Sequence, residues 1–321
     1  LPGETFQSHV DTLRNLVKAK IDNIQVFTCM MLPGSELATP QERKKWNLET
    51  RYRILPRDFT QLKNKKIILE TEECVISSDS LSFDEYVELR LLAFILWTTN
   101  VQVAYDSIKK LFSELKLDIF ELFFQILKTN NTAPPGVQEV MNSYREATKN
   151  ELWDSPEEIM EYFQKESEYE KLLNEEAGIN VIQFHHAMVM SKYFEEWTEN
   201  VILVAKNLIK SKINFDEILE VKFQNIANYC RGLTFNILGK DRKNVKAEYE
   251  FGYNISKWLK NPKLELNDVK FQHPTKIKFE ISDEQYKIVQ NEIDRYGESF
   301  TGISKATRHL QFQFFLRKPS L

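Results

Sequence analysis

Residues 22–37 read DNIQVFTCMMLPGSEL, an apolar run that ends in a proline and a glycine. In an extended backbone this run places apolar side chains on both sides, which is typical of a strand buried on both faces of a parallel sheet. Pro33 lacks a hydrogen-bond donor and Gly34 can adopt a positive φ, so the strand is expected to end there. We therefore predict a buried strand from Ile24 to Leu32.

The same ending occurs at the start of the chain, because residues 1–4 (LPGE) match residues 32–36 (LPGSE). An amphipathic helix is predicted between them over residues 6–20, with Thr5 as its N-cap. A second strand is predicted at residues 50–55. Two strand ends separated by one helix are the period of a (β/α) repeat with a right-handed crossover. The two strands are thus expected to be parallel neighbours, with Leu1 ending an earlier strand that lies outside this sequence.

These segments resemble the radical S-adenosylmethionine (SAM) enzymes, in particular the group with an N-terminal cobalamin-binding domain. The resemblance rests on LPGET at 1–5, MLPGSEL at 31–37 and TRYRILPR at 50–57. It implies that residues 1–76 are the closing strands of a partial (β/α) barrel. In the intact protein it implies SAM, a [4Fe–4S] cluster and, in this group, cobalamin as cofactors. The wall beside the cosubstrate would then include Met30, Met31, Leu32 and Pro33.

The chain lacks the motifs that hold these cofactors. Radical SAM enzymes bind the cluster through a Cys-x-x-x-Cys-x-x-Cys triplet, whereas the cysteines here are the widely separated Cys29, Cys74 and Cys230. The Asp-x-His-x-x-Gly signature of many cobalamin domains is also missing. We therefore expect this chain alone to hold none of these cofactors and to lack the family's activity. Its expected partner is the missing N-terminal region of the same polypeptide.

Composition narrows the class of protein further. A net charge of −4 over 321 residues argues against a nucleic-acid surface. Scattered cysteines indicate a reducing compartment without a disulfide framework. The longest apolar run, residues 91–97, is far shorter than the roughly 20 residues of a membrane-spanning helix. These features predict a soluble cytoplasmic protein that binds neither nucleic acid nor membrane.

The predicted fold class is α/β followed by mostly α. Residues 77–240 are expected to form a helical domain that begins at a capping box between Ser82 and Glu85. Residues 241–321 are expected to form a small α+β tail. That tail would consist of a strand at 276–281, a helix capped by Ser282 and ended by Gly297, and a last strand at 310–316.

Two pairs of residues are candidates for a site. Arg51 and Arg53 lie on one face of the predicted strand at 50–55. Inside a barrel they would bind a substrate carboxylate or phosphate and need acid groups or a bound anion to offset their charge, while an outward face would leave them solvated. His185 and His186 diverge by about 100° on a helix, so we interpret them as packing residues rather than metal ligands. No catalytic residue and no metal ligand is assigned.

The predicted function is the C-terminal portion of a radical SAM enzyme with an unknown substrate. The alternative is a non-catalytic module whose helices bind another protein or a substrate. This alternative follows from the large helix-rich part of the chain, in which no constellation of catalytic groups is visible.

Overall fold

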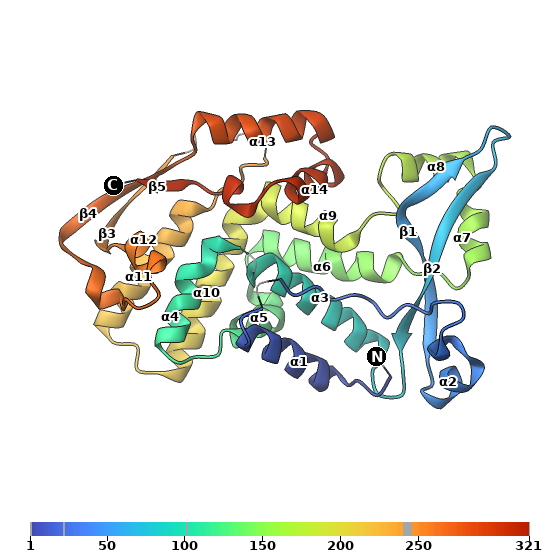
Figure 1. Cartoon of the computed structure of the whole chain (residues 1–321), viewed down its shortest axis with the longest axis horizontal. Helices are drawn as coiled ribbons and strands as arrows, with labels where there is room; N and C mark the ends of the chain where they lie inside the picture. The colour runs from blue at the N-terminus through green and yellow to red at the C-terminus, as the bar shows by residue number, and fades with distance from the viewer. Residues whose placement is uncertain (1, 22, 101, 240–245, 321) are drawn as a thin grey trace. The chain divides into compact units, whose positions relative to one another are not determined.

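The computed structural model describes residues 2–21, 23–100, 102–239 and 246–320. Leu1, predicted to end a strand, and the predicted boundary at residue 240 lie outside these residues. The described residues form a mixed α/β structure that is mainly helical and contains two small antiparallel sheets (Figure 1). The chain divides into two compact units: unit 1 comprises Leu1–Phe94 and Met141–Phe184, and unit 2 comprises Ile95–Val140 and His185–Leu321.

Unit 1 is built around a β-hairpin of β1 (Glu49–Gln61) and β2 (Ile67–Ser77). A short extended segment lies along the other edge of β2, where the Met31 N–H donates to the Glu73 carbonyl at 2.8 Å. The Val75 N–H donates to the Cys29 carbonyl at 2.9 Å. Met30 therefore forms an antiparallel bridge with Cys74.

The predicted parallel pair of strands is wrong. Residues 50–55 do form a strand, but they pair antiparallel with β2, and the described part of residues 24–32 contributes only the bridge at Met30. Because this segment and β1 both run antiparallel to β2, they point the same way but are separated by β2. The turn at residues 62–66 explains the outcome, since a short loop closes at a smaller entropic cost than a crossover connection. No barrel is formed by the described residues.

The helices of unit 1 begin at the capping residues that the sequence indicates. Thr5 caps α1 (Phe6–Lys18), because its hydroxyl accepts from the Ser8 N–H at 3.1 Å. In the same way Ser82 and Glu85 form the capping box at the start of α3 (Phe83–Asn100). The other helical elements wholly within unit 1 are η1 (Glu36–Ala38), α2 (Pro40–Lys45), α7 (Pro156–Phe163) and α8 (Glu166–Leu173).

An apolar cluster holds α7 and α8 against the hairpin, and Figure 1 shows both helices beside β1 and β2. Ile54 and Leu69 of the hairpin pack with Ile159 and Phe163 of α7 and Leu172 of α8. These side chains are buried, so the hairpin is fixed by a core on one face. Its opposite face is described below as the candidate site.

Unit 2 is mostly helical, and the division between the units falls within α3, α6 (Pro135–Asn150) and α9 (Val181–Met188). Its long helices are α10 (Phe194–Lys212) and α11 (Glu217–Leu233), close to the predicted helices at 193–212 and 215–229. A π-helical turn, η4 (Val189–Tyr193), precedes α10. The remaining elements before the tail are η2 (Val103–Tyr105), α4 (Asp106–Glu114), α5 (Phe120–Lys128) and η3 (Asn130–Thr132).

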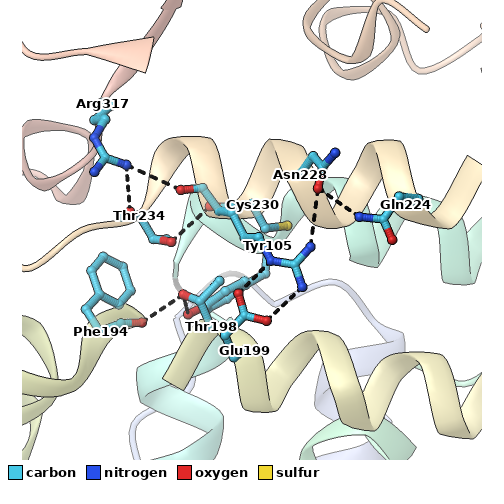
Figure 2. Close-up of polar contacts among 10 residues, drawn as sticks. Tyr105, Phe194, Thr198, Glu199, Gln224, Asn228, Cys230, Thr234 and Arg317 are labelled. Carbon is cyan, nitrogen blue, oxygen red and sulfur yellow. Dashed lines mark hydrogen bonds and ion pairs between the residues drawn. The ribbon is translucent and has the colours of Figure 1, made fainter. Parts of the chain in front are cut away.

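Polar contacts join α11 to α10 and also join α11 to the end of the chain (Figure 2). Tyr105 and Thr198 share a buried hydrogen bond of 3.0 Å. The Arg231 guanidinium of α11 donates to both carboxylate oxygens of Glu199 on α10, at 2.6 and 2.7 Å. Arg317 donates to the carbonyls of Gly232 at 3.1 Å and Thr234 at 2.9 Å, so it caps the C-terminal end of α11.

The predicted tail is partly confirmed. The strand at 276–281 belongs to β4, and Ser282 and Gly297 bound α13 as expected. The strand predicted at 310–316 is wrong, because this segment forms the 3₁₀ helix η6. Here the Gln285 side-chain amide donates to the carbonyls of Phe314 and Leu316, which removes acceptors that a sheet would use. The tail contains β3 (Ala247–Tyr253), α12 (Ile255–Lys260), η5 (Leu266–Val269), β4 (Lys270–Glu280), α13 (Asp283–Tyr296), α14 (Phe300–His309), η6 (Phe312–Phe315) and β5 (Lys318–Ser320).

Strands β3, β4 and β5 form an antiparallel sheet in this order. Among the described residues, no helix combines the length and apolar character needed to cross a membrane.

Candidate functional site

The strand register brings three of the predicted site residues onto one face of unit 1. Arg51 lies opposite Cys74, and Cys74 lies opposite Met30 on its other side. Directly opposite residues of antiparallel strands point to the same face, and neighbouring strands are about 4.8 Å apart. Met30 and Arg51 are therefore separated by about 10 Å, measured between their backbones. Arg53, two residues further along β1, shares this face with its partner Glu72. We call these five residues, together with Glu151 and Arg90 that complete the network around Arg53, the Arg53 face.

The four predicted cofactor-wall residues are divided between the two sides of the extended segment. Met31 is buried, with 4% of its surface exposed, whereas Met30 and Leu32 are 40% and 59% exposed. Pro33 is exposed as well. Burial on both faces was predicted for this segment, and the structure corrects this: Ile24 and Met31 are buried, whereas Met30, Leu32 and also Phe27 (77% exposed) face solvent.

Arg53 is enclosed by acid groups. Its Nε donates to Glu72 on the facing strand, and its Nη1 lies 3.1 Å from Oε1 of Glu151, the residue after α6. The same carboxylate oxygen accepts from Arg90 of α3. All four side chains are largely buried, with 13–17% of their surface exposed. Two cations and two anions thus form a neutral network, which is the condition for burying charge at tolerable cost.

Electrostatics hold the two arginines of this network in their charged form. Burial by itself would lower the pKa of Arg53, but the charge of Glu151, followed by smaller contributions from Cys74 and Glu72, raises it. Burial likewise lowers the pKa of Arg90, whereas the charge of Glu151 raises it, and the net effect is a raised pKa. Burial raises the pKa of the Cys74 thiol to about 11, so that thiol is protonated at neutral pH. The two arginines and the Cys74 thiol can position and hold other groups, but they are poorly suited to exchange protons near neutral pH.

Arg51 has a different environment from Arg53. Its Nε lies 2.9 Å from Asp154, and both side chains are exposed, at 45% and 77%. An exposed pair of this kind contributes little to stability, because water and salt screen it. Arg51 can therefore exchange Asp154 for another anion at low cost, whereas Arg53 cannot leave its two glutamates.

The opposite face of the hairpin carries a second paired cation. Arg43 of α2 donates to both carboxylate oxygens of Glu73, at 2.6 and 2.8 Å. The Thr50 hydroxyl donates to the same carboxylate at 2.6 Å. The hydrogen bonds from Arg43, opposed by burial and aided by Thr50, lower the pKa of Glu73. This contact attaches α2 to the hairpin on the face opposite Arg53.

Sequence reasoning missed the partners of Arg53. Glu72 lies in an acidic stretch between two β-prone pieces of sequence, and recognition of the hairpin would have placed it opposite Arg53. Arg90 and Glu151 gave no signal, because they are separated from Arg53 by 37 and 98 residues in sequence (90 − 53 and 151 − 53).

His185 and His186 are both buried, at 1% exposure. Across residues 2–21, 23–100, 102–239 and 246–320, no group of three or more metal-ligating side chains gathers. A comparison of the chain with protein-family models and with curated proteins finds no match.

Proposed function

We propose that this chain is the C-terminal portion of a radical SAM enzyme and supplies part of the wall around the substrate. In this proposal the cluster and SAM are held by the preceding region of the polypeptide. The chain's own residues bind and orient, in keeping with Arg53 and Arg90, whose pKa values are raised by the charge of Glu151. The substrate stays unassigned.

The observation that carries the proposal is the extended segment before Pro33. It presents Phe27, Met30 and Leu32 to solvent at 77%, 40% and 59% exposure, whereas Ile24 and Met31 of the same segment are buried. An extended apolar segment with an open edge is a template for pairing with another strand. In the proposed enzyme, the earlier strands of the partial barrel pair with this edge and cover these three side chains.

The Arg53 face has two parts in this proposal. Arg53 and Arg90, neutralised by Glu72 and Glu151, form a fixed support beneath the wall. Arg51 and Met30 lie in one cross-strand row and are both exposed. We assign the binding of a substrate anion to Arg51, which has an exchangeable partner, rather than to Arg53.

Two experiments test the proposal. The reading frame before Leu1 is expected to encode a Cys-x-x-x-Cys-x-x-Cys triplet, and a frame without one would rule out the radical SAM assignment. In hydrogen exchange, the amides of residues 23–28 are expected to exchange rapidly in this chain and slowly in the longer polypeptide. Equal exchange in both would show that no strand pairs with this edge.

The alternative function, a non-catalytic binding module, predicts a different result. A start codon next to Leu1 would favour it, because the chain would then act without a catalytic region. Reconstitution of this chain with iron and sulfide without oxygen should yield no stable cluster, since its three cysteines are widely separated in sequence and two of them, Cys74 and Cys230, are buried. Four irons per chain after gel filtration, at about the stoichiometry of one [4Fe–4S] cluster, would contradict both functions as stated.

A further inference from the structure

The end of the hairpin in unit 1 carries a surface that the proposed function does not use. Figure 1 shows β1 and β2 extending beyond α7 and α8 before they meet. We call residues 55–68 the hairpin tip. Ile68 points away from the core, because its neighbours Ile67 and Leu69 belong to the buried apolar cluster. Three apolar side chains of the tip are exposed: Leu55 at 37%, Leu62 at 42% and Ile68 at 36%.

The hairpin tip is basic, in contrast to the chain as a whole. It contains four cations and one anion, Asp58, which gives a net charge of +3 (4 − 1), whereas the chain has a net charge of −4. An exposed group of unpaired cations attracts an anionic partner. The four cations are exposed and form no ion pair with another described residue: Arg57, Lys63, Lys65 and Lys66.

The neighbouring helix α8 carries the opposite charge. Residues 161–176, which we call the α8 surface, contain six glutamates and two lysines, a net charge of −4 (2 − 6). Glu166, Glu170 and Leu173 are spaced i, i+4 and i+7, so they form one stripe along α8. All three are exposed, Leu173 at 57%. The α8 surface therefore combines charge with an exposed leucine, as the hairpin tip does.

The two surfaces lie next to each other in unit 1. The Phe59 ring of β1 is 6.1 Å from the Tyr169 ring of α8 between centroids. Gln164, between α7 and α8, accepts from the Ile67 N–H at 3.3 Å and donates to the Ile67 carbonyl at 2.9 Å. A basic patch beside an acidic patch is self-complementary, because a two-fold rotation places each patch on the opposite patch of a second copy.

The backbone of the hairpin tip is unsuited to pairing with another strand. The register of β1 is broken between Ile54 and Phe59, a stretch that contains Pro56 and a left-handed Arg57 with a φ of 68°. On the edge of β2, the Gln164 side chain occupies the backbone groups of Ile67. Bulges, proline and a covered edge all hinder strand addition. A partner would therefore be contacted through the side chains of the tip.

We propose that the hairpin tip and the α8 surface form an isologous interface between two copies of this chain. The lysines of each tip pair with Glu166 and Glu170 of the second copy, and Leu62 packs against Leu173 of the second copy. Each contact occurs twice in the dimer, because the two copies are related by a two-fold axis. The inference does not depend on the proposed function, which uses the Arg53 face and the edge at residues 23–28.

The test is a charge exchange measured by sedimentation velocity. One variant makes the tip acidic, and the other makes the α8 surface basic. Wild type is expected to dimerise at about 0.1 M salt and to dissociate toward monomers at about 1 M, where screening is stronger. Each variant alone should dimerise at least about tenfold more weakly, because like charges then face each other. The two variants are Lys63→Glu/Lys65→Glu/Lys66→Glu and Glu166→Lys/Glu170→Lys/Glu176→Lys.

An equimolar mixture of the two variants should restore the dimer. The acidic tip of one variant then meets the basic α8 surface of the other, and the acidic α8 surface of the first meets the basic tip of the second. A monomeric wild type at about 0.1 mM chain overturns the proposal. So does a mixture without heterodimers, or a dimer that survives both exchanges, as association through the apolar edge at residues 23–32 would.

A control variant makes the same change in net charge at exposed lysines of unit 2 and should leave the dimer intact: Lys260→Glu/Lys263→Glu/Lys270→Glu. Leu62→Ala tests the apolar contact and should weaken the dimer about fivefold or more without changing the melting temperature. Leu203→Ala, at a leucine of α10 that is 47% exposed, is its matched control. Equal dimer affinities for these two leucine variants contradict the proposed packing on Leu173.

Discussion

Two groups of buried polar side chains, one in each unit, are paired in different ways. In unit 1 the Arg53 face buries charges, and each is joined to an opposite charge: Arg53 to Glu72 and Glu151, and Arg90 to Glu151. In unit 2, His186 and Gln102 are buried neutral groups, and His186 Nδ1 and Gln102 Oε1 have no partner among the described residues. The difference follows from cost, because an unpaired buried charge costs several kcal/mol, whereas an unpaired neutral group costs about 1–3 kcal/mol.

The two groups differ in how completely their buried polar atoms are paired. A network in which every charge is paired is stable and offers little to a new ligand. A cluster with unpaired neutral atoms lowers stability. Arg317 extends the comparison, since it is a largely buried cation of unit 2 whose contacts include the backbone carbonyls of Gly232 and Thr234.

The largest effect is expected from Glu151→Gln. This change leaves Arg53 and Arg90 without the carboxylate that they share, and the free energy of unfolding should fall by about 3 kcal/mol. Urea unfolding followed by circular dichroism measures this change. Asp154→Asn, which removes the exposed partner of Arg51, is the control and should cost less than about 1 kcal/mol. Similar losses for the two variants would show that the Arg53 face is not the paired, buried network described here.

A smaller effect is expected from the acid titration of His186. Its folded-state pKa of about 3 lies below the ordinary value of 6.5, so the unfolded chain binds the proton more readily between these values. Stability from this residue is therefore complete above pH 6.5 and is lost as the pH falls toward 3. Between pH 7 and pH 5, wild type should lose about 2 kcal/mol more than His186→Phe in urea unfolding. Parallel losses in the two proteins would contradict a buried, neutral His186.

The smallest effect is expected from Asn200 and Thr198, two buried polar residues of α10 that differ in their hydrogen bonding. Both amide atoms of Asn200 are buried without a described partner, whereas the Thr198 hydroxyl is hydrogen bonded to Tyr105 and to the Phe194 carbonyl. Asn200→Leu should stabilise the protein by about 1 kcal/mol, and Thr198→Val should destabilise it by about the same amount. Melting temperatures of the two variants, measured side by side, check the opposite signs. A loss of stability in both variants would show that the Asn200 side chain is hydrogen bonded in the folded protein, contrary to this prediction.

Much of the local structure follows from the sequence alone. Thr5, Ser82 and Ser282 begin helices, and Gly297 ends one with a φ of 86°. These signals act over a few residues, because a capping side chain bonds to the backbone only two or three positions away. The strands at 50–55 and 276–281 were also predictable, since their composition and pattern are local as well.

The tertiary structure alone decided which segments meet. The apolar run at 24–32 was predicted to pair with a strand that instead formed a hairpin with β2, because the nearer partner closes the shorter loop. Arg53 was a candidate from its own strand, but its partners come from β2, α3 and the end of α6. Likewise, Gln102 meets His186 across 84 positions of the chain. Pairing over such distances depends on the packing of whole helices and strands, which no short stretch of sequence encodes.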